Sequence, residues 1–462
     1  MTRTTDTAFP GGCQAHRGAL LHFLEDPGNE PEPAAGSLDY FDDGLLVLKN
    51  GQVLAAGSAE DLLPRLPANA PVTNWPGALI LPGFIDTHVH MPQLGVIASY
   101  GAQLLDWLET YTFPHEACFS NVDWANAEAQ RFTDLLLAHG TTSGLVFCTS
   151  HPASVDALFE AAEARGMALT AGKVMMDRHA PDNLTDTPRA SYDDSLALLK
   201  KWHGRGRQRY AITPRFAATS SSEQLALAGQ LAAEHPDVMV QTHWAENTGE
   251  IQWVSELFPD RISYLDVYDH YGLLGAHTVL AHGIHIDDRD RERLAETGTR
   301  IAFCPTSNTF LGSGLFDLSS AREAGVSVGL ASDVGGGTSL SMLTTMAEAY
   351  KVCRLRGQAL TPWQAFYMAT LGNARVLDQD AQTGSFRAGR HADFVVLDQT
   401  ASPAFRMKQA HNQTLAETLF NLMILGDDRA IAATAVAGEV RYLRPVSDTV
   451  TFPAFTTPNQ GA

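Results

Sequence analysis

The sequence is poor in cysteine and in basic residues. It has five cysteines, an odd number, and no two of them form a Cys-x-x-Cys pair. This argues against a disulfide framework and against a zinc site built on thiolates. Lysine and arginine total 32 against 52 for aspartate and glutamate, a net charge of −20. Such a surface repels phosphate backbones and anionic lipid headgroups, so we expect neither nucleic acid nor a membrane as a partner. A small neutral or cationic substrate fits this charge better.

Long apolar runs are also missing. No stretch approaches the roughly 18 residues that a membrane-spanning helix needs, and the N-terminus has no basic start followed by an apolar segment. We therefore expect a cytoplasmic protein. Apolar residues still make up 45% of the 462 residues, and charged residues only 18%. This is the composition of a globular protein, and it excludes a disordered chain or a fibrous repeat.

Short strand-like runs occupy both ends of the chain. Between residues 16 and 80, and again between 384 and 442, brief apolar segments alternate with glycine, proline and aspartate turn residues. Neither end is large enough to bury a good core alone, so we expect the two to pack together as a small β-sandwich. Residues 1–81 and 381–462, including a C-terminal tail, are assigned to this domain. Residues 82–380 then form an insertion between its halves.

The middle of the chain alternates strand-type and helix-type segments. Eight apolar runs are separated by alanine- and leucine-rich stretches. The runs are residues 85–90, 142–148, 168–175, 210–216, 238–246, 278–285, 300–305 and 326–333. Near-continuously apolar strands between amphipathic helices indicate an α/β fold with a parallel sheet buried on both faces. Ionisable residues end nearly every run, which favours a (β/α)8 TIM-type barrel over the alternative of an open sheet with one switch point.

Histidine and carboxylate side chains follow several of these runs. The first run ends in His88-x-His90, and the period of two places both imidazoles on one face of a strand. His243, His282 and Asp333 follow three later runs. Each of these residues alone is as well explained as a helix cap or a surface ion pair, but in a barrel the carboxyl ends of the strands converge on one mouth. Histidines with a carboxylate and no cysteine predict a site for a divalent metal, most often zinc, with one position open for water.

A hydrolytic metal site also needs groups that move protons. Asp333 can bind the metal and accept a proton from the water. Glu246 lies three residues after His243, just past the strand, so it can face the substrate and deliver a proton. His282 can orient the water or stabilise a developing oxyanion.

Three other segments have competing interpretations. Residues 335–337 are three glycines without the Lys-Ser/Thr of a phosphate-binding loop, which favours a loop that closely approaches the barrel mouth. Lys173 is either a carbamylated lysine that bridges two metals or an ordinary buried lysine, and the second is favoured because nothing near it marks another metal site. The aromatic-rich residues 100–120 fit a helical lid, an amphipathic surface helix or part of a dimer contact.

Together these residues resemble the amidohydrolase superfamily. The stretches that carry the resemblance are Leu81-Pro-Gly-Phe-Ile-Asp-Thr-His88-Val-His90, the later His243, His282 and Asp333, and Ala388-Gly-Arg-His-Ala-Asp393. Within the superfamily the chain is most similar to the guanine deaminase family. That narrower resemblance rests on His90-Met-Pro-Gln93, Leu104-Leu-Asp-Trp-Leu-Glu-Thr-Tyr-Thr-Phe-Pro114, Thr213-Pro-Arg215-Phe216, His243-Trp-Ala-Glu246-Asn247 and Cys304-Pro-Thr-Ser-Asn308. It covers residues 16 to 445.

The resemblance implies a barrel flanked by a β-sandwich, and a set of site residues. One zinc ion per subunit would be held by His88, His90, His243 and Asp333, with Glu246 as proton shuttle and His282 beside the water. Gln93, Arg215 and Phe216 would contact the base. A guanidinium can donate two hydrogen bonds to the O6 and N7 edge of guanine, and a phenyl ring can stack on the purine. A buried ion pair for Arg215 and core packing for Phe216 are the alternatives.

The implied reaction is zinc-dependent hydrolytic deamination of guanine to xanthine and ammonia, in a cytoplasmic homodimer. Because the same metal site serves other substrates, the alternative is a deaminase or chlorohydrolase of another heterocycle, such as a modified purine, a pterin or a triazine. A non-catalytic protein on a degenerate barrel is disfavoured, since every metal and proton-transfer position is intact. One departure from the family's pattern is His179, where a polar residue, often asparagine, is expected.

Overall fold

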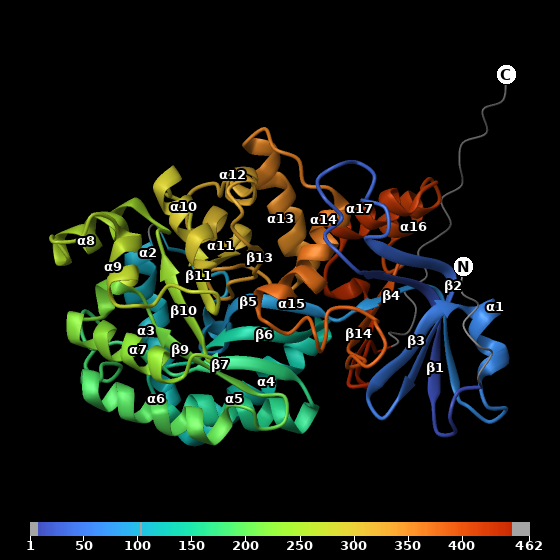
Figure 1. Ribbon diagram of the computed structural model, residues 1–462, viewed down its shortest axis with the longest axis horizontal. Helices are drawn as coiled ribbons and strands as arrows, with labels where there is room; N and C mark the ends of the chain where they lie inside the picture. Colours follow the sequence, from blue (N-terminus) through green and yellow to red (C-terminus); the bar gives the residue numbers. More distant parts are fainter. Residues whose placement is uncertain (1–7, 102–103, 446–462) are drawn as a thin grey trace.

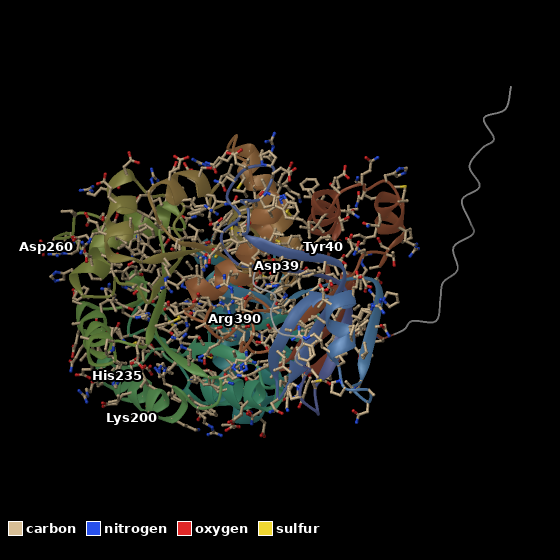
Figure 2. The ribbon with its side chains drawn as sticks, turned by 45° about the vertical axis from the view of Figure 1, so that its right-hand side comes forward. Asp39, Tyr40, Lys200, His235, Asp260 and Arg390 are labelled. Atoms are coloured by element: carbon tan, nitrogen blue, oxygen red, sulfur yellow. The ribbon has the colours of Figure 1, made fainter. Side chains whose placement is uncertain are left out.

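The computed structural model describes residues 8–101 and 104–445 (Figure 1). Strands from the two ends of the chain form one sheet and strands from the middle form a second, with helices around both. Charged side chains such as Lys200, on a helix, and Asp260, in a turn, lie on the outer surface (Figure 2). No helix among the described residues has the length and apolar character needed to cross a bilayer.

Both ends of the chain contribute to the terminal sheet. Its strands are β1 (Gln14–Phe23), β2 (Leu38–Lys49), β3 (Gln52–Ser58), β4 (Val72–Pro82), β14 (Phe394–Asp398), β15 (Ile431–Val436) and β16 (Glu439–Leu443). They are hydrogen-bonded in the order β16-β15-β14-β4-β1-β2-β3. β1 and β4 are parallel, and the other neighbours are antiparallel.

The terminal sheet curls around its own core. Val53 on β3 and Ala433 on β15 belong to one buried apolar cluster, although these two strands lie near opposite edges of the sheet. Val53 N donates a hydrogen bond to Arg390 O at 2.8 Å, which holds β3 against the chain that leads into β14. The expected β-domain from both chain ends is therefore confirmed. Its sandwich-like interior comes from one continuous curled sheet, because the β1–β4 pairing joins the two halves.

The middle of the chain forms a parallel eight-stranded barrel. Its strands are β5 (Phe84–His90), β6 (Thr141–Phe147), β7 (Ala168–Gly172), β9 (Arg209–Pro214), β10 (Met239–Trp244), β11 (Thr278–His282), β12 (Arg300–Phe303) and β13 (Val328–Leu330), paired in this order. Just past the strand ends, His90 N donates to Val334 O at 2.7 Å and Asp333 N donates to His88 O at 2.9 Å. These bonds connect the first strand to the last. The predicted barrel is confirmed, and the open sheet is wrong.

Each of the eight predicted runs overlaps one of these strands, and three of the strands begin one residue before the run. The third run is interrupted at Lys173, so that β8 (Val174–Met175) forms a separate strand beside β9. The limits predicted for the domains, after residues 81 and 380, stay a prediction. In the structure β4 ends at Pro82 and β5 begins at Phe84, so the chain passes from one sheet to the other at this point.

Helices surround the barrel and cover one side of the terminal sheet (Figure 1). The longer ones are α4 (Val122–Ala138), α5 (Pro152–Arg165), α6 (Pro188–Trp202), α7 (Ser222–Glu234), α8 (Thr248–Leu257), α10 (Asp288–Thr297), α13 (Met342–Leu355) and α17 (Leu415–Leu425). The shorter ones are α1 (Ala59–Leu62), α9 (Tyr264–His270), α11 (Pro305–Phe310), α12 (Leu318–Glu323), α14 (Pro362–Tyr367), α15 (Asn373–Val376) and α16 (Pro403–Gln409). Local sequence sets their ends: the Asn121 side chain caps α4 by accepting from Trp124 N, and Gly166 ends α5 with a φ of 72°.

Asp393 connects the barrel to the terminal sheet. Its buried carboxylate accepts hydrogen bonds from Arg207 Nη1 at 3.0 Å, Thr383 Oγ1 at 3.1 Å and Ala437 N at 2.8 Å. Arg207 lies just before β9 of the barrel, and Asp393 just before β14. Burial alone would raise the pKa of Asp393, but the guanidinium and these hydrogen bonds hold it below its usual value. The last residue of the Ala388–Asp393 motif is therefore structural.

We expect Asp393→Asn to lower the free energy of unfolding by about 3 kcal/mol, because it leaves a largely buried guanidinium without its counter-charge. The change is measured as a fall in the midpoint of thermal unfolding. Asp43→Asn is the matched control, since Asp43 pairs with Arg17 where both side chains are exposed, and exposed pairs contribute little to stability. Equal unfolding midpoints for the two variants would contradict the connecting role of Asp393.

Candidate active site

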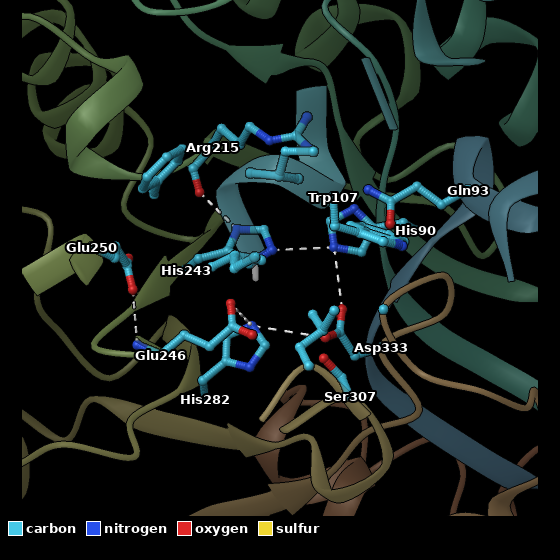
Figure 3. A pocket seen from close by; sticks show the side chains of 15 residues that line it. His90, Gln93, Trp107, Arg215, His243, Glu246, Glu250, His282, Ser307 and Asp333 are labelled. Carbon is cyan, nitrogen blue, oxygen red and sulfur yellow. Dashed lines mark hydrogen bonds and ion pairs between the residues drawn. The ribbon is translucent and has the colours of Figure 1, made fainter. Parts of the chain in front are cut away.

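Four predicted ligand side chains converge at the carboxyl end of the barrel. His88 and His90 end β5, His243 lies near the end of β10, and Asp333 follows β13. His90 Nε2 lies 3.2 Å from His88 Nε2 and 3.1 Å from His243 Nε2. Asp333 Oδ1 lies 3.1 Å from His88 Nε2. It lies 3.4 Å from His90 Nε2 (Figure 3). All four candidate ligand atoms lie within 4.8 Å of one another.

These distances fit a tetrahedral metal site. Ligand atoms about 2.0–2.1 Å from zinc, at the corners of a tetrahedron, lie about 3.3 Å apart. Burial lowers the pKa of His90 to about 4, and burial with the surrounding imidazoles lowers that of His243 well below its usual value. Burial alone would raise the pKa of Asp333, but the neighbouring histidines hold it well below its usual range. Neutral imidazoles with one ionised carboxylate are suitable ligands for a divalent cation.

Neighbouring groups orient the ligands. His243 Nδ1 lies 2.7 Å from Arg215 O, which assigns the proton to Nδ1 and leaves Nε2 free to bind a metal. Asp86, buried on β5, accepts a hydrogen bond from His88 N at 3.2 Å and one from Ser332 N at 3.1 Å. It therefore holds the backbone next to two of the ligands.

His282 and Glu246 lie on the other side of Asp333. His282 Nε2 is 3.5 Å from Glu246 Oε2 and 3.8 Å from Asp333 Oδ2 (Figure 3). His282 Nδ1 lies 2.9 Å from Asn308 Oδ1, which places the ring proton on Nδ1. Nε2 is buried and has no hydrogen-bond partner among the described residues. This nitrogen is therefore available to a water molecule or a substrate atom between the two carboxylates.

Burial and the nearby Asp333 carboxylate raise the pKa of Glu246 to about 8. Its carboxyl group therefore carries a proton at pH 7. Ser313 Oγ donates to Glu246 Oε1 at 3.0 Å, and Glu250 Oε2 accepts from Glu246 N at 3.0 Å. Glu250 in turn accepts from Tyr264 Oη at 2.7 Å. These contacts fix both the backbone and the side chain of a carboxylic acid that can donate a proton.

Backbone strain is also present at the site. Ala245, His282 and Asp333 have φ values of 50°, 75° and 50°, a region that side chains other than glycine rarely adopt. The three glycines at 335–337 allow close contacts: a Cβ at Gly335 would lie 2.5 Å from Gln93 O, and one at Gly337 would lie 1.7 Å from Ser332 O. The predicted close-approach loop at the barrel mouth is confirmed.

A pocket opens beside the cluster. Its lining includes the three predicted base contacts, Gln93, Arg215 and Phe216, together with His90, His243, Glu246, His282 and Asp333. The structure thus brings the predicted site residues together, with His88 in contact with His90 behind the lining. Arg215 also forms the buried ion pair that the sequence left as an alternative, with Glu116 at 2.6 Å.

Residues 104–120 form a wall of the pocket. The segment contains α2 (Leu104–Trp107), a π-helical turn (Leu108–Thr112) and α3 (Phe113–Glu116). Leu104, Trp107 and Leu108 line the pocket, whereas Tyr100 is 82% exposed. The apolar face of the predicted helix therefore covers the site, and only part of the aromatic pattern contributes to it.

Two residues singled out in the sequence lie outside the pocket lining. Lys173 is buried and its ammonium group pairs with Asp186, as an ordinary buried lysine would. His179 packs against the Trp253 ring with centroids 5.0 Å apart, and its Nδ1 lies 2.8 Å from Ala218 O. Trp253 also contacts Phe216, with centroids 6.1 Å apart. His179 is thus separated by the Trp253 ring from Phe216, one of the predicted base contacts.

Residues 79–441 match the model of the Amidohydrolase family. The chain belongs to this family. This chain is 48% identical over 431 residues to the guanine deaminase of Escherichia coli (strain K12). The alignment covers 93% of this chain and 98% of that protein.

Solved structures agree with the sequence relatives. The E. coli guanine deaminase matches this amidohydrolase with a TM-score of 0.91 and 47% identity, over 94% of this chain and 100% of that one. The guanine deaminase of C. acetobutylicum, solved with guanine bound in its active site, matches with a TM-score of 0.82 and 29% identity, over 93% and 99% of the two chains. The resemblance to the guanine deaminase family is therefore confirmed.

Proposed function

We propose that this amidohydrolase hydrolyses guanine to xanthine and ammonia with one zinc ion per chain. The observation that carries the proposal is one pocket lined by metal-ligand side chains, a buried glutamate with a raised pKa and an arginine beside a phenyl ring. The full-length similarity to guanine deaminases supports the choice of substrate. A cytoplasmic homodimer stays a prediction.

His88, His90, His243 and Asp333 Oδ1 would hold the zinc. A zinc ion at this position would lower the pKa of a neighbouring water molecule toward 7 and so supply the nucleophile. Asp333 Oδ2 lies on the side of His282, away from the other ligands, so it can accept a proton from the water. His282 Nε2, without a hydrogen-bond partner among the described residues, orients the attacking oxygen.

Glu246 activates the base. In guanine, N3 is the ring nitrogen next to C2 that carries no hydrogen, and its protonation makes C2 electrophilic. The raised pKa of Glu246 keeps the required proton on its carboxyl group at neutral pH. The oxygen of water bonds to C2 and the bond from C2 to the amino nitrogen breaks. One proton of the water returns to the Glu246 carboxyl group, in place of the proton that this group gave to N3. The other proton of the water leaves with ammonia.

Arg215, Gln93 and Phe216 orient the base. The arginine and glutamine donate hydrogen bonds to acceptors on the purine, and Phe216 packs against its face. The Leu104–Trp107–Leu108 wall excludes water around the reacting carbon, which strengthens the electrostatic interactions there.

The test is an assay of purified, zinc-loaded protein with guanine, in which xanthine and ammonia are followed separately. We expect the two products in equal amounts. A parallel panel contains an amino-substituted triazine, a chloro-substituted triazine and a pterin. Turnover of a panel compound without turnover of guanine would contradict the substrate and leave the metal site and the barrel unaffected.

A further inference from the structure

Glu116 lies between the two side chains proposed to donate hydrogen bonds to the base. Its side chain is 1% exposed. Oε1 accepts a hydrogen bond from Gln93 Nε2 at 3.0 Å, and Oε2 accepts one from Arg215 Nη1 at 2.6 Å. Because a single carboxylate holds both donors, their relative position depends on Glu116.

The same helical turn holds Arg215 from a second direction. The Arg215 guanidinium carbon lies 5.2 Å from the centre of the Phe113 ring, within the range of a cation–π contact. Phe113 and Glu116 are the first and last residues of α3. The segment that walls the pocket therefore also fixes its buried cation.

These contacts leave hydrogen-bond donors of Gln93 and Arg215 free at this end of the pocket. Gln93 Oε1 accepts from Gly335 N at 3.2 Å while its Nε2 donates to Glu116. The contact with Glu116 thus fixes the orientation of the Gln93 amide, with its NH2 group toward Glu116. The second N–H of this NH2 group stays free to donate to a ligand. Arg215 donates to Glu116 through Nη1, and its Nη2 and Nε groups make no hydrogen bond to the described residues. A ligand that pairs with these donors must offer acceptors.

We propose that Glu116 is a positioning residue that makes this pocket selective for a purine with an oxygen, and not an amino group, at position 6. This inference rests on the proposed deamination of guanine. Guanine O6 accepts hydrogen bonds from the donors that Glu116 holds in place. A 6-amino group would turn its own N–H groups toward them and leave the buried donors unpaired, which is the basis of strong rejection.

Glu116→Gln tests this role with nearly unchanged volume. The new amide must turn its NH2 group toward either Arg215 or Gln93, which places donor against donor. We expect the KM for guanine to rise about tenfold or more, with a smaller change in kcat. The preference for guanine over 2,6-diaminopurine and over 2-aminopurine should shrink by a similar factor. Ammonia released from C2 reports on all three substrates.

Glu109→Gln is the matched control, because Glu109 is an exposed glutamate of the same helical segment. It should leave both KM and preference as in the wild type. Zinc content and the thermal unfolding midpoint show whether each variant is folded and loaded. In an Arg215→Ala background, which itself should raise the KM, adding Glu116→Gln should change the preference by a smaller factor than in the wild type, because only Gln93 then depends on Glu116.

A folded, zinc-loaded Glu116→Gln protein with unchanged KM and unchanged preference would overturn the inference. So would an equal loss of kcat for all three substrates, since that is the result of a purely structural role. If Glu116→Gln does not fold, Glu116→Asp keeps the charge on a shorter side chain and should give intermediate values, whereas a wild-type preference would refute the role. Failure of the wild type to turn over guanine would instead refute the proposed function.

Discussion

Replacing Glu246 with glutamine should lower kcat by about three orders of magnitude while the zinc content stays unchanged. Glutamine has the same size and can still contact Ser313, but it has no proton to deliver to the base. Glu246 is also absent from the cluster of four ligand atoms. The loss should therefore fall on kcat, and the KM for guanine should change little, because the proton transfer contributes only in the transition state. Steady-state kinetics with metal analysis of the same preparation measure both.

Glu256→Gln provides the control for the loss of a carboxylate near the site. Glu256 is exposed on α8, the helix that follows Glu246, and its replacement should leave kcat unchanged. Loss of zinc from Glu246→Gln would identify Glu246 as a metal ligand and end its assignment as the acid. A kcat within about tenfold of the wild type would show that another group delivers the proton.

The metal cluster could be predicted from sequence because it follows from topology. Parallel strands in a barrel bring their carboxyl ends together, so residues as distant as His88 and Asp333 meet once the fold is known. The period of two in a strand does the same locally for His88 and His90. The small number and the spacing of the cysteines are enough to disfavour thiolate ligands. These inferences need only the repeating geometry of strands and not the course of any loop.

Glu116 could not be found in the same way. Its partners Gln93 and Arg215 are 23 and 99 residues away, and all three lie on loops or short helical turns outside the strands. The contacts of Glu116 depend on how residues 104–120 fold over the mouth, which neither strand nor helix periodicity specifies. Asn308, which orients His282, belongs to the Cys304–Asn308 motif. The motif assigns it no role, because Asn308 lies on α11 and its partner His282 ends β11.

The order in which strands pair in the terminal sheet could not be predicted from local sequence either. Apolar alternation identifies a strand but not its neighbour. The parallel pairing of β1 with β4 joins the two chain ends into one sheet, and it determines that the sheet curls around its core. The raised pKa of Glu246 likewise required the structure, because it results from burial and from a carboxylate contributed by another strand.

Removal of the metal should abolish turnover and also lower the thermal stability of the protein. Chelation is expected to stop the reaction and zinc to restore it, because the metal supplies the activated water. The thermal unfolding midpoint should fall as well, because a bound ion stabilises the folded state in proportion to the logarithm of its free concentration. His90→Asn removes the ligand that lies within 3.4 Å of the other three. Metal affinity should fall by more than about a hundredfold, a larger effect than loss of an orienting partner causes.

The unfolding midpoint separates a metal site from a site that only resembles one. In the wild type the midpoint should fall on chelation, whereas in His90→Asn it should be insensitive to chelator. His235→Asn is the control, because His235 follows α7 on the outer surface (Figure 2), and it should respond to chelator like the wild type. If chelation left the wild-type midpoint and turnover unchanged, the cluster would not hold a functional metal.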